Sequence, residues 1–291
     1  MSEERKERNE VFAPKGGAPQ GVDPAIQSMS AADAFAKEFG LDIPVQIVPL
    51  PSAGKTYPEG SVLHNCETIE IRGMTAREED ILTSQALLKK GTVITELIKS
   101  CVTNKAIDPS LMLTGDRNAM MVAIRITGYG HLYDAEVSCS SCDRTQAQEF
   151  NLAMLPIRRL DIDPVSPGMN VFEHRLPFTK KLVKFRYLTG RDEEEIMAVQ
   201  ERQKKLGLNS DSMVTTNLMH SIVAVENIED RAKIAQFVRM MPARDSLSLR
   251  DFIRKSEPGI RMRQEVTCND CGHIEEVSMP MGVKFLWPSA D

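Results

Sequence analysis

Hydrophobic and polar positions follow the same order in two stretches of the chain. The first begins with alternating residues at 67–72, which predict a strand, and continues into an acidic segment with helical spacing. The second begins with a comparable strand at 182–186 and a similar acidic helix. The aligned stretches share Arg72 with Arg186, Thr75 with Thr189, Arg77 with Arg191, and Glu79 with Glu193. This ordered repetition predicts an internal duplication.

Both acidic helices carry start and stop signals. Thr75 stands three residues before Glu78, and Thr189 stands three before Asp192, which is the spacing of a capping box. The acidic residues also lie at the positive end of each helix dipole, so capping explains them without a catalytic role. The predicted ends are Lys89-Lys90 before Gly91 and Lys204-Lys205 before Gly207.

Further helices are predicted in each half. Apolar spacing indicates helices at 93–102 and 117–127, and then at 211–225, 229–240 and 247–256. The segment at 117–127 is apolar on nearly all sides, which is typical of a buried helix. Cys101 falls on the apolar side of its helix and is expected in the core, whereas Cys66 is expected in a strand and has no predicted role.

Each half ends with a similar short motif that contains a pair of cysteines. Glu136-Val-Ser leads into Cys139 and Cys142, and Glu265-Val-Thr leads into Cys268 and Cys271. Alternating residues after each pair predict return strands, which place the cysteines at hairpin tips. We therefore expect an α+β fold of internally duplicated strand–helices–CxxC hairpin halves. The predicted segments are an N-terminal tail with a short helix at 1–45, a first repeat at 46–155 and a second repeat at 156–291.

The paired cysteines have the spacing of zinc ligands. Two residues between thiolates let both sulfurs face one ion about 2.3 Å away, and a structural Zn²⁺ takes four such ligands. One pair from each half therefore predicts a single zinc-ribbon-like site formed by Cys139, Cys142, Cys268 and Cys271. A redox dithiol and a metal-free pair remain alternatives. His131 and His273 are near enough in sequence to replace a thiolate, although both fit isolated surface residues.

Familiar signatures of catalysis are missing from the sequence. Gly54-Lys55-Thr56 resembles the end of a phosphate-binding loop, but Pro49 stands where the first glycine is required. The chain has no HExxH, GxSxG or GxGxxG motif, and its five histidines show no metal or triad spacing. We therefore expect no catalytic residues, no cofactor-binding residues and no enzyme activity.

Composition narrows the function classes further. Of the 291 residues 42% are hydrophobic, which suffices for a sizeable core and is too many for disorder throughout. No apolar run approaches the roughly 18–20 residues of a membrane span, and the charged first residues do not predict a secretory signal. A net charge of −5 argues against general attraction to nucleic acid. Two basic clusters keep a nucleic-acid-binding zinc protein as an alternative: Lys180, Lys181, Lys184 and Arg186, and Arg250, Arg254, Arg261 and Arg263.

The first 45 residues differ from the rest. Residues 1–25 are charged and contain several Gly and Pro, which is typical of a flexible tail. Residues 26–40 carry Ala34, Phe35 and Phe39 on one side of a short predicted helix. This helix is expected either to dock on a partner or to fold back on the chain's own core.

Several motifs, taken in order, resemble one protein family. They are Ile71-Arg-Gly-Met-Thr-Ala-Arg-Glu-Glu-Asp80-Ile-Leu, Leu113-Thr-Gly-Asp-Arg-Asn118, Ile124-Arg-Ile-Thr-Gly-Tyr-Gly130, the pair at Cys139, and Leu188-Thr-Gly190. Over roughly residues 45–287 the chain is similar to the baseplate hub proteins and hub assembly chaperones of T-even-like contractile-tailed phages.

This resemblance implies a non-enzymatic structural or assembly component of the tail baseplate, in its hub region. Its expected location is the virion, and the host cytoplasm during assembly. The expected partners are other phage tail and baseplate proteins, with residues 1–45 docking on a neighbouring subunit, and neither a membrane nor nucleic acid. The alternative within the family is a transient assembly chaperone that is absent from the mature virion.

Overall fold

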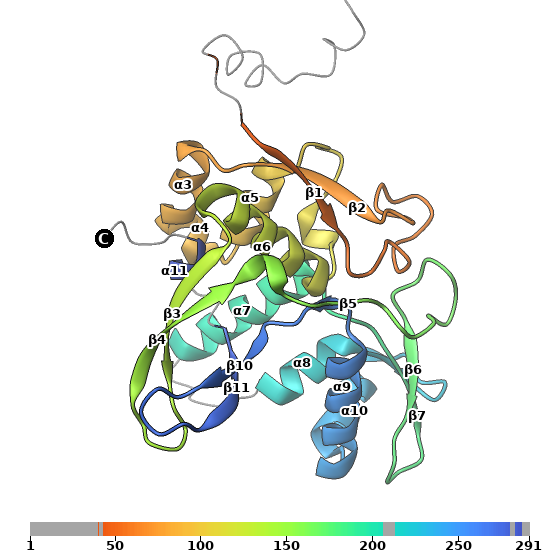
Figure 1. Cartoon of the computed structure of the whole chain (residues 1–291). Helices are drawn as coiled ribbons and strands as arrows, with labels where there is room; N and C mark the ends of the chain where they lie inside the picture. Colours follow the sequence, from red (N-terminus) through yellow and green to blue (C-terminus); the bar gives the residue numbers. More distant parts are fainter. Residues whose placement is uncertain (1–39, 41–42, 206–212, 280–282, 287–291) are drawn as a thin grey trace, which may run out of the picture. The chain divides into compact units, whose positions relative to one another are not determined.

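The computed structural model describes residue 40 and residues 43–205, 213–279 and 283–286. The predictions for residues 1–39 and for Gly207 lie outside these described residues. From Pro44 onward the chain forms one compact unit of helices and small antiparallel sheets (Figure 1). This confirms the α+β class.

The first half is built around a two-stranded sheet and a buried helix. Strand β1 (Val45–Pro49) pairs antiparallel with β2 (Thr68–Arg72), and helices α3 (Ala76–Thr83), α4 (Gln85–Lys90) and α5 (Val93–Cys101) follow. After the short 3-10 helix η2 (Pro109–Leu111), the long helix α6 (Thr114–Tyr129) packs against β1, β2 and α5. Met120 and Ile124 of α6 and Cys101 of α5 are completely buried, as the apolar spacing predicts.

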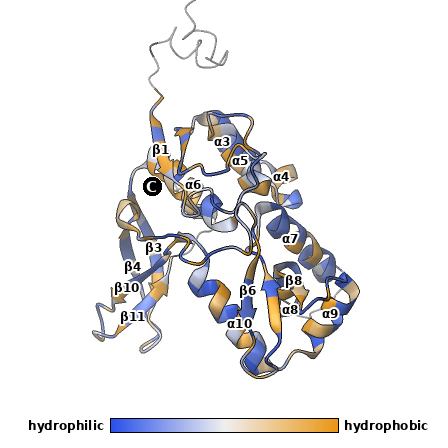
Figure 2. Ribbon diagram, turned by 90° about the vertical axis from the view of Figure 1, so that its right-hand side faces the viewer, coloured by the Kyte–Doolittle hydropathy of each residue, from blue (hydrophilic) through white to orange (hydrophobic). Residues whose placement is uncertain are grey.

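The second half surrounds a three-stranded antiparallel sheet. Its strands are β6 (Phe172–Arg175), β7 (Leu182–Phe185) and β8 (Ile222–Val225), with β7 in the middle. The flanking helices are α7 (Gly190–Lys205), α8 (Met213–Ser221), α9 (Arg231–Met240) and α10 (Ala243–Ser256). Apolar residues predominate in β7 and β8, whereas β6 is mainly blue in Figure 2 because three of its four residues are polar. The rings of Phe172, Phe185 and Tyr187 meet in the core with centroids 4.8–5.8 Å apart.

Short strands complete the unit and link its halves. Strand β5 (Ile157–Arg158) pairs with β9 (Gly259–Ile260), which lies against α6. Two hairpins follow the same plan: β3 (Leu132–Ser138) with β4 (Thr145–Asn151), and β10 (Arg263–Thr267) with β11 (Ile274–Ser278). The short helices η3 (Leu152–Met154) and α11 (Val283–Leu286) both contact α6.

Several features differ from the sequence predictions. The helix predicted at 211–225 ends at Ser221, because the apolar and largely β-branched residues Ile222–Val225 pair with β7 instead. The first acidic helix is broken at Ser84 into α3 and α4. Cys66 lies just before β2 rather than inside a strand, and its Sγ donates a hydrogen bond to the Thr68 carbonyl.

Each half has a corresponding ion pair at the start of its acidic helix. Arg72 donates two hydrogen bonds to the Glu78 carboxylate, which also accepts from the amide and hydroxyl of Thr75. Arg186 binds Asp192 in the same way, and that carboxylate accepts from the amide and hydroxyl of Thr189. The acidic positions of both predicted capping boxes are therefore in place.

The two halves also resemble each other in a segment that pairs with the strand preceding each acidic helix, and in the hydrogen bonds that join the halves. Val102, just after α5, forms an isolated bridge with Ile71, as Ile222 after α8 pairs with Phe185. Where α6 and α7 begin, the Thr114 amide donates to the Leu188 carbonyl at 2.9 Å and the Gly190 amide to the Met112 carbonyl at 3.0 Å. These correspondences support an internal duplication with repeats at 46–155 and 156–291, which stays a prediction.

The two helix-cap carboxylates predict how stability depends on pH. Burial alone would raise the pKa of each, but hydrogen bonds from Arg72, Ser100 and Thr75 lower the pKa of Glu78 to about 2. Likewise Arg186 and Thr189 lower the pKa of Asp192 to about 2. Because these groups bind protons more weakly folded than unfolded, their stabilisation is complete above about pH 5 and is lost as the pH falls towards 2. We expect each to contribute about 2–3 kcal/mol at neutral pH, measured by urea unfolding at pH 7 and pH 3.

Two variants isolate this effect. Glu78→Gln keeps the shape of the side chain but removes its charge, so its free energy of unfolding should be lower at pH 7 and should change less with pH. Glu59→Gln, in an exposed turn, is the matched control and should keep the pH profile of the unmodified chain. An unchanged profile in Glu78→Gln would show that this ion pair does not stabilise the fold.

Candidate metal centre

The two hairpins present their cysteines through identical loops. In the first, the Cys139 amide donates to the Arg144 carbonyl and the Asp143 amide donates to the Cys139 carbonyl, both at 2.9 Å. In the second, the Cys268 amide donates to the His273 carbonyl at 2.8 Å and the Gly272 amide to the Cys268 carbonyl at 2.9 Å. Asp143 and Gly272 occupy the same place and both adopt a positive φ, 55° and 70°. This loop turns both sulfurs of a pair to one side.

The four sulfurs of Cys139, Cys142, Cys268 and Cys271, here called the four-cysteine cluster, meet between the hairpin tips. Cys139 Sγ lies 3.7 Å from Cys271 Sγ, and Cys142 Sγ lies 3.7 Å from Cys268 Sγ. All four sulfurs lie within 4.8 Å of one another. A disulfide needs about 2.05 Å, so these are free thiols rather than bridges. The distances match a tetrahedron of sulfurs, because ligands about 2.3 Å from a central ion are about 3.8 Å apart.

Contacts around the cluster are reciprocal. The Ser140 amide, next to Cys139, donates to Glu275 Oε1 in the opposite return strand at 2.8 Å. The Asn269 amide, next to Cys268, donates to Gln146 Oε1 in the other return strand, also at 2.8 Å. Glu275 and Gln146 stand at equal distances in sequence after the second cysteine of their hairpins. The hairpins thus face each other in an approximately twofold arrangement.

Ionisation of the thiols is mutually dependent. Backbone amides of Cys271 and Asp270 lower the pKa of Cys268 to about 7, so this residue supplies a thiolate near neutral pH. At Cys142 the amide of Arg144 favours the thiolate, but desolvation and hydrogen bonds with the neighbouring thiols raise the pKa to about 12. Four adjacent negative charges repel one another, and a bound cation is what would hold all four as thiolates.

The chemistry of this donor set is that of a soft metal ion. Thiolates select zinc or iron in tetrahedral sites, and a site closed by four protein ligands has no position left for a substrate. Among the described residues, neither His131 nor His273 belongs to the cluster. Sequence analysis identified the four cysteines but missed Gln146 and Glu275. Their matching positions after the two cysteine pairs were the available signal.

A second group of potential ligands has another explanation. Asp192, Glu195 and His220 place ligand atoms within 4.8 Å of one another. However, both oxygens of Asp192 already accept hydrogen bonds from Arg186 and Thr189. This group is therefore a helix cap with a histidine beside it, and it gives no argument for a metal.

Comparison with known proteins identifies the family. A family model described as the T4 bacteriophage base plate protein matches residues 45–287, which include both hairpins and both capped helices. No curated protein and no solved structure matched the chain. In the part of the chain that the structure describes, no helix has the length and apolar character needed to span a membrane. Since this family model matches most of the chain, the protein belongs to the T4 bacteriophage base plate protein family.

Proposed function

We propose that the protein is a non-enzymatic structural component of the hub region of a contractile-phage baseplate, held together by one structural Zn²⁺. The family match is the observation that carries the baseplate role. The four-cysteine cluster supports a scaffold rather than an active site, because four thiolate ligands leave a metal closed to substrate.

The zinc would fix the two halves of the chain to each other. Each hairpin supplies two of the four thiols, so the ion would join segments that are far apart in sequence. Structural zinc contributes about 10–16 kcal/mol to the folding of small zinc-binding peptides, which is comparable with the total stability of an ordinary domain. A scaffold clamped in this way would keep its binding surfaces in a fixed geometry while other tail proteins assemble on it.

Other tail and baseplate proteins are the proposed partners. Residues 1–45 would dock on a neighbouring subunit, with the virion as the final location and the host cytoplasm as the place of assembly. The alternative is an assembly chaperone that leaves before the particle is complete. Both functions need protein-binding surfaces, and they differ in whether the chain stays in the particle.

Mass spectrometry of purified phage particles separates these two functions. We expect the chain at a fixed copy number relative to other baseplate proteins, in intact particles and in isolated baseplates. Its presence in assembly intermediates but absence from finished particles would overturn the resident role and favour the chaperone. A gel shift at low salt tests the nucleic-acid-binding alternative, for which affinity should fall steeply as salt is added.

A further inference from the structure

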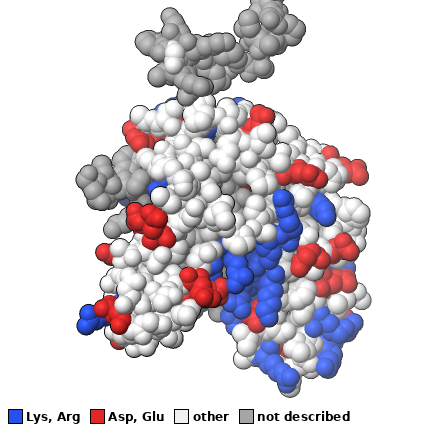
Figure 3. Space-filling view, in the orientation of Figure 1, with Lys and Arg blue, Asp and Glu red and all other residues white. Residues whose placement is uncertain are grey.

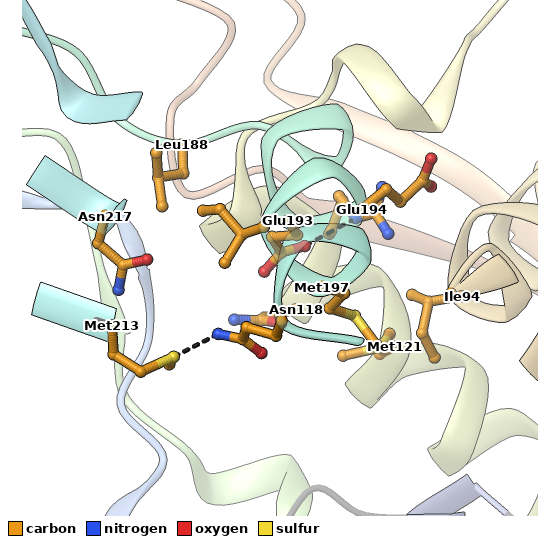
Figure 4. Close-up of a pocket in the computed structure, with 13 residues that line it drawn as sticks. Ile94, Asn118, Met121, Leu188, Glu193, Glu194, Met197, Met213 and Asn217 are labelled. Atoms are coloured by element: carbon orange, nitrogen blue, oxygen red, sulfur yellow. Dashed lines mark hydrogen bonds and ion pairs between the residues drawn. The ribbon is translucent and has the colours of Figure 1, made fainter. Parts of the chain in front are cut away.

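Two adjoining hollows lie between helices of the two halves. The first, about 370 Å³, lies between α5, α6, α7 and α8, and the second, about 270 Å³, lies between α8 and α10. Leu188, Met213 and Asn217 line both hollows, so the two adjoin, and together they are called the groove below. Figure 4 shows Met121 and Met197 near Ile94 on one side of the first hollow, with Leu188, Met213 and Asn217 on the other.

The lining is apolar, adaptable and partly exposed. Met121, Met197 and Met213 contribute flexible thioether side chains, which suit surfaces that must fit another protein. Met197, Met213 and Val214 are 48%, 46% and 41% exposed, although large apolar side chains gain most when they are buried. Apolar residues gathered at one hollow are typical of a protein-docking site.

The acidic residues of the first hollow have partners within the chain. Glu193 Oε2 lies 3.6 Å from Nε of the buried Arg117, and Glu194 accepts a hydrogen bond from Thr95. In the second hollow, burial raises the pKa of Glu257 to about 7 despite the nearby Arg158. The guanidinium of Arg117 therefore offsets the charge of Glu193, and Glu257 is only partly ionised at neutral pH.

Two exposed arginines line the second hollow. Arg250 and Arg254 on α10 line it and are exposed. Arg254 pairs with Asp251 at 2.6 Å, whereas none of the residues that the structure describes forms an ion pair with Arg250. Figure 3 shows a dense field of Lys and Arg in the region where Figure 1 places α8 to α10. The chain as a whole carries a net charge of −5, so this basic face is a local feature.

We propose that the groove binds an acidic peptide segment, with apolar side chains on one face, from another protein of the baseplate. Its apolar side chains would pack against the methionines and Leu188, and its carboxylates would pair with Arg250 and Arg254. Recognition of an amphipathic segment in an apolar groove with complementary charge at the rim is a common mode of protein docking. The inference rests on the proposed baseplate function and specifies a surface that serves it.

Site-specific photo-crosslinking in phage-infected cells tests this proposal on the full chain. A benzophenone amino acid replaces Val214 in the groove or, as a control, Ile274, which is 57% exposed on the β11 hairpin. We expect the Val214 probe, and not the Ile274 probe, to crosslink to a baseplate protein within a segment that is acidic and apolar on one face. The pair Arg250→Glu with Arg254→Glu should reduce this crosslink about tenfold, equivalent to about 1.4 kcal/mol of binding free energy.

A second charge-reversed pair is the matched control. Arg77→Glu with Lys99→Glu makes the same change in net charge at exposed sites of α3 and α5 and should leave the crosslink intact. Crosslinks to residues 1–43 of this chain, to nucleic acid, or equally from both probes would each overturn the proposal. An unchanged Val214 crosslink in the chain that carries both Arg250→Glu and Arg254→Glu would also overturn it. Absence of a crosslink while the chain is present in finished particles would reject the groove and leave the structural function standing.

Discussion

Replacing Cys268 with serine is expected to abolish metal binding and to unfold or greatly loosen the region where the halves meet. Serine keeps nearly the same size, but its hydroxyl does not ionise near neutral pH and is a poor ligand for zinc. The remaining three sulfurs would lack the fourth ligand that completes their tetrahedron. Because structural zinc is worth about 10–16 kcal/mol in small peptides, its loss can exceed the stability of the whole unit.

Three measurements on the purified chain check this prediction. Elemental analysis should find one zinc per unmodified chain and none in Cys268→Ser, and a thiol count should rise when the metal is removed. Thermal unfolding should move to a much lower temperature or lose its cooperative transition. Strong chelators should reproduce the effect in the unmodified chain, and restored zinc should reverse it.

Cys66→Ser is the matched control. Cys66 lies outside the four-cysteine cluster, and its sulfur donates a hydrogen bond to the Thr68 carbonyl that a serine hydroxyl can replace. This variant should bind one zinc and unfold close to the normal temperature. A Cys268→Ser chain that unfolds like the Cys66→Ser chain would contradict the zinc clamp, and a redox or unused role for the thiols would take its place.

Features encoded by neighbouring residues were predictable from the sequence. The strands before Thr75 and Thr189, the acidic caps and the cysteine hairpins all depend on spacings of a few residues. Strand β8 was predicted as part of a helix because a short apolar run fits a helix or a buried strand equally well. Its pairing with β7 decides between the two. The four cysteines were assigned to one site because one pair alone supplies only two of the four ligands that a structural zinc ion needs.

Features created by packing between distant segments were not predictable. The contacts of Gln146 and Glu275 arise only when the hairpins face each other. The groove combines residues from α5 to α8 and α10, which no local pattern connects. The basic residues show the same limit: Arg186 belongs to one of the two basic clusters of the sequence but binds Asp192, whereas Arg250 of the other cluster is exposed beside the groove.

At Gly115 the two halves pack backbone against backbone, and its replacement by alanine is expected to be strongly destabilising. A Cβ atom at this position of α6 would lie 1.7 Å from the Pro258 carbonyl oxygen and 3.1 Å from the Gly259 Cα. Both obstacles are backbone atoms, so β9 would have to move away from α6. We expect a loss of about 3 kcal/mol, at the upper end for overpacked sites, and a melting temperature about 6–12 °C lower.

Gly128→Ala in the same helix provides the matched control. There the nearest atom to a new Cβ would be the terminal methyl carbon of Met74, at 2.7 Å, and a flexible methionine can turn aside. Alanine also favours a helix over glycine by about 1 kcal/mol, so this variant should unfold within a few degrees of the normal temperature. If Gly115→Ala were equally harmless, α6 and β9 could separate freely, and the close contact between the halves would not be what fixes their relative position. A large effect at Gly115 alone would show that the halves are joined by backbone packing as well as by the four-cysteine cluster.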